Sequence, residues 1–393
     1  MSGFSVLHII TDLDIGGAER MLTQLLPYLA EKGVRQSVVC LKNEGPLAEV
    51  IRLQGYDVTC LGMKPGKADR VSFCQLLKII AKTKPDLIQS WLYHADLYGS
   101  LAALLTRRKI VWGLHNNALS PEVKRSTRIV VRLLSILSRF VPKRIISVSN
   151  AATAEHVRQG YCAKRFVYIP NGFNTEIFKP DSGRRTYFRE KLRIDDRVVL
   201  YGNISRFDPQ KNHLGLLNAW KKFSELRPEW DVRLLLAGKG LNTSNRELNI
   251  WLSRLQMTDR IYLLGERDDV PTVLNALDVF VLSSLSEAFP LALGEAMSTG
   301  LLCLSTDCGD AAEMLGENGI IVPRDDVEAL AKGMRKALIM PAAERDAMRV
   351  AVRQRAVKEY TLAQVADRYL QVYRGVLGFP EEIKQESAEN TTA

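Results

Sequence analysis

The chain has 393 residues, of which 46% are hydrophobic and 25% are charged. A single hydrophobic core rarely grows beyond about 250 to 300 residues, so the length predicts two domains, and the composition excludes an intrinsically disordered chain. The formal net charge of +10 predicts an anionic partner, which a nucleotide, a nucleic acid or a lipid surface could provide.

Cysteine usage and the length of the apolar segments indicate a compartment. The six cysteines form no Cys-x-x-Cys pair, which argues against a zinc site and against a disulfide framework. No apolar stretch reaches about 18 residues, and the N-terminus lacks a basic region, so neither a transmembrane helix nor a signal peptide is expected. These features predict a cytoplasmic protein.

Short β-branched segments alternate with amphipathic segments along the first half of the chain. Strands are expected at 6–10, 36–41, 57–61, 87–89, 110–112, 145–148 and 167–169, and helices at 18–32 and 47–54. This alternation is typical of a parallel sheet that is covered by helices. The first half therefore predicts a Rossmann-like α/β domain, which we place at residues 1–170.

A turn-rich segment, Pro170-Asn171-Gly172-Phe173-Asn174, interrupts this pattern and predicts a hinge. The alternation then restarts, with strands expected at 198–204, 232–237, 261–264, 279–283 and 302–306 and helices at 213–226 and 245–255. We place a second Rossmann-like domain at residues 171–355. An amphipathic segment at 362–377 ends the ordered chain, and the polar tail at 380–393 is expected to be disordered.

Two loops carry residues that could bind an anionic ligand. Gly16 and Gly17 follow the first strand and open a helix, where backbone N–H groups can approach an anion, although a tight turn without a ligand would use the same residues. Arg206 and Lys211 follow the first strand of the second half, where two cations could neutralise a diphosphate leaving group without a metal. They could equally be solvated surface charges.

The segment from Ser286 to Ala296 is the most specific of the candidate sites. Glu287 lies in a loop after a strand, Pro290 suits the first turn of a helix, and Glu295 falls inside that helix. The loop amides from Phe289 to Leu291 would lie at a positive helix end suited to phosphate, and both carboxylates can accept hydrogen bonds from sugar hydroxyls. The alternative is that Glu287 is only a favourable acid near a helix N-terminus and that Glu295 is a surface residue.

Five short motifs occur in a characteristic order. They are Gly16-Gly17-Ala18-Glu19-Arg20, Val148-Ser149, Ile169-Pro170-Asn171-Gly172, Arg206 with Lys211, and Glu287 separated by seven residues from Glu295. This ordered set resembles glycosyltransferase family 4, and the resemblance reaches to about Leu377. It implies a GT-B fold: two facing Rossmann-like domains with parallel sheets, and a C-terminal helix at 356–379 that crosses back to the first domain.

The resemblance also implies roles for individual residues in a retaining, metal-independent hexosyltransferase. Arg206 and Lys211 would bind the diphosphate of a nucleotide diphosphate sugar, a UDP- or GDP-sugar. Glu295 would hold the ribose hydroxyls and Glu287 those of the donor sugar. The remaining implied donor-binding residues are Gly16, Gly17, Val270, Phe289, Pro290 and Leu291.

Two histidines follow strands of the first half. His115 lies past the end of the strand at 110–112, where sites form in open α/β sheets, and the resemblance implies a contact with the donor sugar. The alternative is a hydrogen-bonded structural histidine. His94 and Asn116 are candidates for acceptor binding. Asp12 and Asp14 match a metal-binding Asp-x-Asp pattern, but their position before the glycines fits the family's loop, so no metal and no cofactor is expected.

A basic helix expected at 121–140 could contact an anionic membrane surface. Arg125, Arg128, Arg132 and Arg139 fall on one stripe, Ile129, Ile136 and Phe140 flank it, and Val130, Leu133, Leu134 and Leu137 occupy the opposite face. A helix packed on the sheet with a solvated basic rim is the alternative. Membrane contact would suit a glycan acceptor carried on a lipid, and a peripheral location at the inner membrane.

Other functions are compatible with parts of this pattern. A sugar-nucleotide 2-epimerase shares the GT-B architecture but would lack the pairs Arg206–Lys211 and Glu287–Glu295. A non-catalytic sugar-nucleotide-binding protein would bind the donor without turnover. Nucleic acid is not expected as a partner, because aromatic residues are sparse among the basic residues between Arg107 and Arg144. By analogy with bacterial relatives, we expect a role in surface polysaccharide or lipopolysaccharide biosynthesis.

Overall fold

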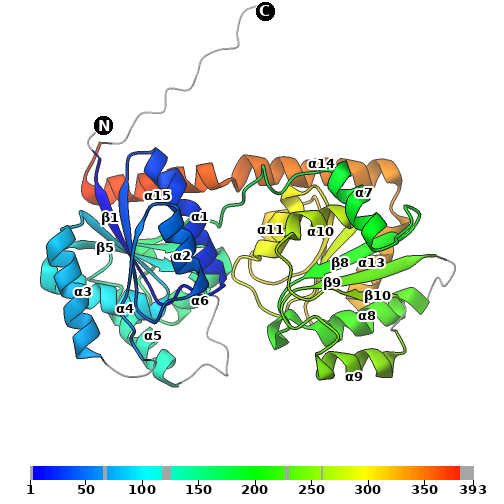
Figure 1. The fold of residues 1–393 in the computed structure, drawn as a ribbon, viewed down its shortest axis with the longest axis horizontal. Helices are drawn as coiled ribbons and strands as arrows, with labels where there is room; N and C mark the ends of the chain where they lie inside the picture. Colours follow the sequence, from blue (N-terminus) through cyan, green and yellow to red (C-terminus); the bar gives the residue numbers. More distant parts are fainter. Residues whose placement is uncertain (1–2, 65–68, 117–124, 226–229, 258–259, 381–393) are drawn as a thin grey trace, which may run out of the picture.

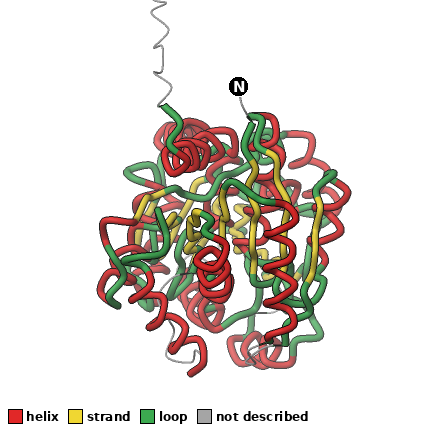
Figure 2. The backbone as a smooth tube through the Cα atoms, turned by 90° about the vertical axis from the view of Figure 1, so that its left-hand side faces the viewer, coloured by secondary structure: helices red, strands yellow, loops and turns green. Residues whose placement is uncertain are grey.

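A computed structural model describes residues 3–64, 69–116, 125–225, 230–257 and 260–380 of the chain. Two parallel sheets, each covered by helices, form two domains that lie side by side (Figure 1). Helices flank the strands on both sides (Figure 2), which explains why strands such as β4 are buried along their whole length. The predicted α/β fold with two Rossmann-like domains is confirmed.

The first sheet has seven strands in the order β3-β2-β1-β4-β5-β6-β7. Its strands are β1 (Ser5–Ile10), β2 (Arg35–Cys40), β3 (Asp57–Cys60), β4 (Leu87–Trp91), β5 (Lys109–Leu114), β6 (Arg144–Ser147) and β7 (Phe166–Tyr168). Its helices are α1 (Gly17–Glu31), α2 (Pro46–Leu53), α3 (Arg70–Thr83), α4 (Tyr93–Thr106), α5 (Arg125–Leu137) and α6 (Asn150–Arg158), with a short 3-10 turn, η1 (Ala163–Arg165).

The second sheet has six strands in the order β10-β9-β8-β11-β12-β13. Its strands are β8 (Val199–Ile204), β9 (Val232–Ala237), β10 (Ile261–Leu263), β11 (Val279–Leu282), β12 (Leu302–Thr306) and β13 (Ile320–Val322). The helices are α7 (Ser182–Lys191), α8 (His213–Glu225), α9 (Arg246–Leu255), α10 (Val270–Ala276), α11 (Leu291–Ser298), α12 (Ala311–Leu315), α13 (Val327–Ile339), α14 (Ala342–Glu359) and α15 (Leu362–Leu377), with η2 (Pro209–Lys211) after β8.

Each sheet reverses its strand order once, between β1 and β4 in the first domain and between β8 and β11 in the second. At such a reversal the two following helices leave toward opposite faces of the sheet, so a crevice opens at the carboxyl ends of the two strands. The two switch points therefore fix where ligands can bind, before any side chain is considered.

Two segments that cross between the domains run next to each other. Phe173 donates its backbone N–H to the carbonyl of Tyr360 (2.7 Å), and Leu362 donates its own to the carbonyl of Phe173 (3.2 Å). The Phe173 ring lies directly over Gly294 of α11, where a Cβ would collide with it. This close approach requires a glycine and ties the crossing segment to the second domain.

The C-terminal helices bridge the two domains, as expected for this fold (Figure 1). Val352 and Ala356 of α14 belong to a core of the second domain, whereas Tyr369 and Tyr373 of α15 are buried in the core of the first. A capping box of Thr361 with Gln364 begins α15 at the crossing point.

Two predicted segments differ from the structure or extend beyond its described part. The basic helix, expected at 121–140, ends as α5 at Leu137, because Pro142 lacks an amide donor and disfavours helical backbone at the preceding residue. Residues 121–124 lie outside the described residues. The predicted disordered tail lies outside them too, apart from Pro380.

Candidate active site

The loops that follow β8 and β11 are joined at the switch point of the second domain. Leu285 donates its backbone N–H to the carbonyl of Gln210 (2.8 Å), and the Ser283 hydroxyl donates to the carbonyl of Lys211 (2.9 Å). Adjacent strands deliver both loops to the same edge of the sheet, which brings two motifs separated by more than 70 residues into one site.

Lys211 and Glu287 form an ion pair at the centre of this site. The Lys211 ammonium donates to Oε1 of Glu287, and the Ser284 hydroxyl donates to the same oxygen at 2.7 Å. The two charged side chains retain only 18% and 13% of their exposure, so water screens their interaction weakly. The pair therefore sets a cation and a carboxylate in fixed positions next to the crevice.

Arg206 lies on the outer side of the same loop. Its side chain is 60% exposed, and its Nε donates to Oδ2 of Asp208 at 3.0 Å. Asp208 also caps η2 by accepting from the amide of Gln210. The guanidinium thus stays at the solvent side, where a ligand can reach its remaining N–H groups.

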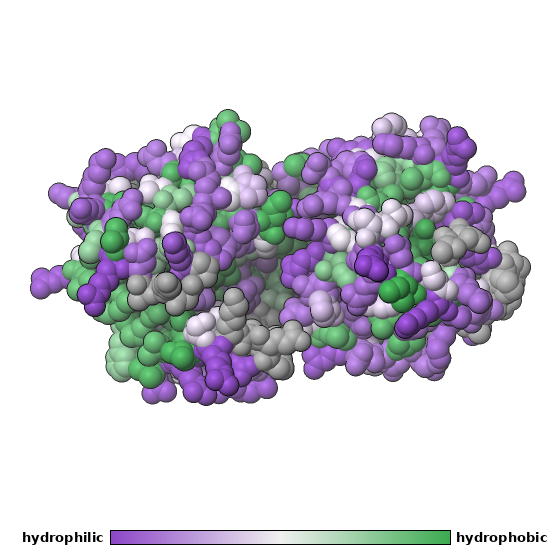
Figure 3. All heavy atoms as spheres, turned by 60° about the horizontal axis from the view of Figure 1, so that its bottom comes forward, coloured by the Kyte–Doolittle hydropathy of each residue, from purple (hydrophilic) through white to green (hydrophobic). Residues whose placement is uncertain are grey.

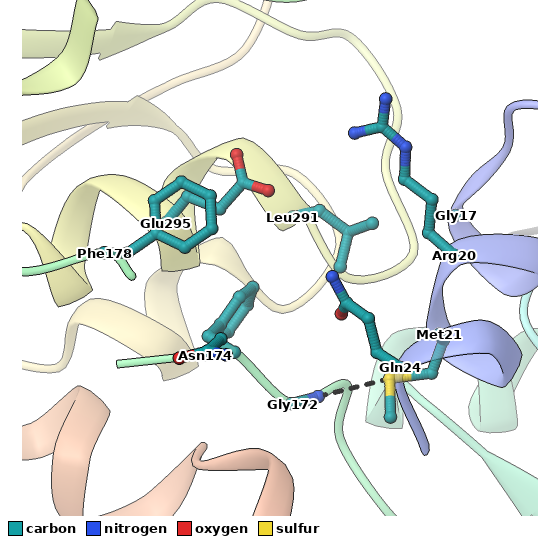
Figure 4. A pocket seen from close by; sticks show the side chains of 10 residues that line it. Gly17, Arg20, Met21, Gln24, Gly172, Asn174, Phe178, Leu291 and Glu295 are labelled. Carbon is teal, nitrogen blue, oxygen red and sulfur yellow. Dashed lines mark hydrogen bonds between the residues drawn. The ribbon is translucent and has the colours of Figure 1, made fainter. Parts of the chain in front are cut away.

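Glu295 projects from α11 toward the first domain. Figure 4 shows Glu295 and Leu291 of α11 on one side of a small cavity and Arg20 and Gln24 of α1 on the other. Burial raises the pKa of Glu295 to about 7, and the positive charge of Arg20 partly offsets this rise. The cavity measures about 20 Å³, which is room for roughly one water molecule.

Residues 289–291 form the start of α11. Pro290 is the N-cap residue, one position earlier than the first turn in which the sequence placed it, and Leu291 is the first helical residue. Phe289 is buried against the rings of Phe173 and Tyr360, at centroid distances of 6.1 and 5.7 Å. The aromatic contacts hold this helix start at the switch point of the sheet.

The glycine turn of the first domain meets α11 across the interface. Gly17 begins α1, and a Cβ on it would come within 3.4 Å of Cδ1 of Leu291. The Glu19 carboxylate folds back against Gly16, where any side chain at position 16 would collide with it. Burial, with help from the nearby charge of Asp12, raises the pKa of Glu19 to about 7.

His115 lies at the end of β5 with its imidazole stacked on the indole of Trp91 (centroids 4.8 Å apart). Burial lowers the pKa of His115 to about 3, against the opposing effect of the Asn171 amide, so the ring is neutral near pH 7. Both ring nitrogens are buried, and neither completes a hydrogen bond to another described residue. A ligand hydroxyl could supply the missing partner.

Trp91 is a supporting residue that the sequence interpretation did not single out. Its indole N–H donates to Nδ1 of His8 (3.2 Å), and its ring also stacks on Tyr369 of α15 (centroids 5.9 Å apart). An accepting Nδ1 means that the His8 proton sits on Nε2, which donates to Oε1 of Gln36 (3.1 Å). The indole that supports His115 is thus fixed by a hydrogen bond as well as by packing.

The two acceptor-side candidates lie on the first domain. His94 is the second residue of α4 and is partly buried, and its pKa is lowered by burial and by the charge of Lys42. Lys42 itself pairs with Asp12 (2.7 Å). Asn116 is exposed beyond the end of β5. Asp12, expected to belong to the glycine loop, thus has a cation as its partner.

The donor-side candidate Val270 lies where the loop after β10 meets α10. Val270 is the first residue of this helix, and Asp269 before it forms a two-point ion pair with Arg267 (2.7 and 2.6 Å). The pair fixes the backbone that leads into the helix. The donor-side candidates of the second domain thus gather at the carboxyl edge of its sheet, where Gly17 of the first domain meets Leu291, and His115 lies at the carboxyl edge of the first sheet.

Sequence reasoning missed several residues whose partners are distant in the chain. Arg20 was quoted only as part of a motif, and Gln24 one turn later had no motif at all, although both line the Glu295 cavity. Their i, i+4 spacing on α1 was the available signal. Within the described ranges, no group of three His, Cys, Asp or Glu side chains is placed to hold a metal ion.

Two Rossmann-like domains with parallel sheets, bridged by the C-terminal helices, define a fold of the GT-B type. The chain resembles the crystal structure of Anabaena Alr3699/HepE in complex with UDP (TM-score 0.83, 22% identity). The likeness covers 94% of this chain and 100% of the other. It also resembles sucrose-phosphate synthase from Thermosynechococcus elongatus (TM-score 0.79, 19% identity), over 95% of its own length and 99% of that chain.

Sequence comparison identifies the family. Residues 15–177 match the model of Glycosyltransferase Family 4, and residues 195–339 match that of Glycosyl transferases group 1. The chain therefore belongs to the family 4 glycosyltransferases, as its motifs indicated.

Two curated relatives act on lipid-linked sugars. The chain is 26% identical over 336 residues to UDP-Gal:alpha-D-GlcNAc-diphosphoundecaprenol alpha-1,3-galactosyltransferase of Escherichia coli (84% of this chain, 86% of the relative). It is 25% identical over 321 residues to N,N'-diacetylbacillosaminyl-diphospho-undecaprenol alpha-1,3-N-acetylgalactosaminyltransferase of Campylobacter jejuni (78% and 81%). The protein is a glycosyltransferase. Another relative, 24% identical over 86% of this chain and 88% of its own length, is the capsular polysaccharide biosynthesis glycosyltransferase CapM of Staphylococcus aureus.

Proposed function

We propose that this protein transfers a hexose from a UDP- or GDP-sugar to a glycan carried on a lipid diphosphate, with retention of anomeric configuration and without a metal ion. The observation that carries the proposal is the partly buried Lys211–Glu287 pair at the switch point of the second sheet. It supplies a cation for the diphosphate and a carboxylate for the sugar within one crevice. The role is in bacterial surface polysaccharide or lipopolysaccharide assembly.

The donor is held mainly by the second domain in this proposal. Lys211 and Arg206 contact the diphosphate, the amides at the start of α11 add a helix N-terminus, and Glu295 accepts hydrogen bonds from the ribose hydroxyls. Glu287 accepts hydrogen bonds from the donor sugar. These cations are in place before reaction, so they stabilise the leaving-group charge without reorganisation.

His115 contributes a neutral hydrogen-bonding group rather than a proton carrier. Its lowered pKa excludes an imidazolium near pH 7, and its two unpaired ring nitrogens suit sugar hydroxyls. The stacked indole of Trp91 holds the His115 imidazole in place. His94, Lys42 and Asn116 lie on the acceptor side of the first domain.

The reaction proceeds on one face of the donor sugar. The bond from the anomeric carbon to the phosphate oxygen breaks, and its electron pair goes to the diphosphate. The acceptor oxygen forms the new bond from the same side, and its proton passes to the departing phosphate oxygen. The alpha linkage named for the E. coli relative supports this stereochemistry, since an alpha-linked donor gives an alpha product only by retention.

The acceptor class supports a location at the cytoplasmic face of a membrane. All six cysteines are described and free, which suits a reducing compartment. No helix in the described part of the chain is long and apolar enough to cross a bilayer. The enzyme would then approach a lipid-linked acceptor as a peripheral protein.

Donor binding and turnover test the proposal separately. Thermal unfolding with a panel of UDP- and GDP-sugars identifies the donor, because a ligand at 100 times its dissociation constant adds about 2.7 kcal/mol of stability. Incubation of the selected donor with polyprenyl diphosphate glycans, followed by NMR of the product, reports the anomer. An inverted anomer, or activity abolished by a metal chelator and restored by a divalent cation, would contradict the mechanism.

A further inference from the structure

Helices α4 and α5 expose a stripe of large apolar side chains. Ile129, Leu133 and Ile136 of α5 and Phe140, in the turn just after this helix, follow one another at spacings of four, three and four residues, and they are 58, 46, 61 and 76% exposed. With 100° between successive residues, the three α5 members of this stripe point about 160° away from the face that buries Val131 and Leu134. The stripe therefore faces largely toward solvent.

The neighbouring helix α4 presents a second apolar stripe. Leu101, Leu104 and Leu105 are exposed, whereas Ala102 and Ala103 between them are buried against the sheet. Helices α4 and α5 pack against each other, so the two stripes belong to one side of the first domain. The sequence had indicated a membrane-contacting surface on the basic helix alone, with Leu133 on the face opposite the arginines. In the structure Leu133 is exposed, and leucines of α4 extend the apolar surface.

A basic border accompanies this apolar surface. Arg125, Arg128, Arg132 and Arg139 of the α5 segment are exposed beside its apolar stripe. Between Asp96 and Glu155 the sequence contains one acidic residue, Glu122, and Asp96 is buried. The surface thus combines aliphatic and aromatic side chains with a strong positive charge.

The lower side of the molecule in Figure 1 is brought forward in Figure 3. Apolar side chains gather there on the first domain among hydrophilic ones, and the groove between the two domains is seen from the same side. A planar partner that touched this surface would lie next to the groove in which the candidate active site faces the first domain.

We propose that the α4–α5 surface, formed by the two apolar stripes and their arginines, docks on an anionic phospholipid bilayer. The arginines attract acidic headgroups, and Leu104, Leu105, Ile136 and Phe140 enter the interfacial layer. Large apolar side chains exposed beside arginines favour a lipid surface over a purely polar partner such as nucleic acid. The inference deepens the proposed function, because a lipid-linked acceptor is reached only at a membrane.

Vesicle cosedimentation of the full-length protein tests this inference. Wild-type protein is expected to pellet with phosphatidylcholine vesicles that contain phosphatidylglycerol, and to pellet less with phosphatidylcholine alone. Each arginine lost should weaken partitioning roughly fivefold, so R132E/R139E should lower it by well over tenfold. I136S/F140S should lower it also at about 0.01 M salt, where screening is weak and electrostatic attraction reaches about 30 Å.

Helix α9 of the second domain offers matched controls. It carries the exposed residues Arg246, Ile250 and Arg254, so R246E/R254E and I250S change the same chemistry on the other domain. These variants should pellet like wild type. All variants are checked for wild-type thermal unfolding and for the stabilisation produced by the donor.

Three outcomes overturn the inference. They are wild-type protein that stays in the supernatant with anionic vesicles at low salt, α5 variants that bind like wild type, and α9 variants that lose binding to the same extent. Because donor-induced stabilisation is measured without vesicles, failure of membrane docking and failure of the proposed glycosyl transfer give different results.

Discussion

The contact between α6 and α12 offers a sharp test of how the two domains are held together. Asp310, at the start of α12, is 3% exposed and accepts three hydrogen bonds from the first domain. Its donors are the Ser149 hydroxyl (2.7 Å), the Asn150 amide (2.9 Å) and the Ala151 amide (3.1 Å). A carboxylate thus occupies the N-terminus of α6, where the helix dipole favours negative charge.

Replacing this carboxylate should weaken the interdomain contact strongly. The variant Asp310→Ala leaves three donors without their acceptor, and hydrogen bonds to a charged group contribute about 1.5–3 kcal/mol each, not fully additively. We expect a loss of about 3 kcal/mol, which is a shift of roughly 150-fold in the equilibrium between joined and separated domains. Small-angle X-ray scattering should show a larger radius of gyration, and kcat/KM should fall.

Glu313 provides the matched control on the same helix. It is exposed and accepts from the Asn150 side chain at 3.1 and 3.0 Å, so Glu313→Gln should cost less than about 1 kcal/mol. Asp310→Asn, which keeps one acceptor oxygen, should fall between the two. If Asp310→Ala scatters like Glu313→Gln and retains its kcat/KM, the assigned role of Asp310 is wrong.

The remaining predictions concern the candidate site. Lys211→Met should lower kcat/KM about 100- to 1000-fold, because it removes the cation that stabilises the leaving group, and Lys211→Arg should recover part of the loss. A loss of kcat/KM below about tenfold in steady-state kinetics would contradict this role. Because burial raises the pKa of Glu295 from 4.5 to about 7, its ionisation costs the folded state stability, so the unfolding free energy should fall as the pH rises through this window. In the proposal the ionised Glu295 carboxylate binds the ribose, so calorimetry should show that UDP affinity rises through about pH 7 in wild type and stays constant in Glu295→Gln. The same pH dependence of UDP affinity in both proteins would refute this role of Glu295. Trp91→Leu removes the stacking partner of His115 and should lower the melting temperature and kcat, with partial recovery of kcat in Trp91→Phe; a lower melting temperature with unchanged kcat would leave Trp91 a purely structural residue.

Much of the fold could be predicted from local pattern. The strands at 6–10 and 232–237 and the helix at 245–255 agree with β1, β9 and α9 to within a residue, because periodicity and turn residues act over short distances. The Gly16-Gly17 turn, the Arg206 loop and the Glu287 loop each follow a strand, so their location at the carboxyl edge of a sheet followed from chain order alone.

The sequence by itself determined the repeated α/β pattern, the hinge and the motif order, since each is encoded by residues close together in the chain. Only the tertiary structure decided which groups meet. The Lys211–Glu287 pair and the Asp310–Ser149 bond join residues 76 and 161 positions apart, and nothing local to either partner specifies the other. The outward stripe of leucines on α4 was equally hidden, because an apolar residue signals burial until the packing of its helix shows which side faces solvent.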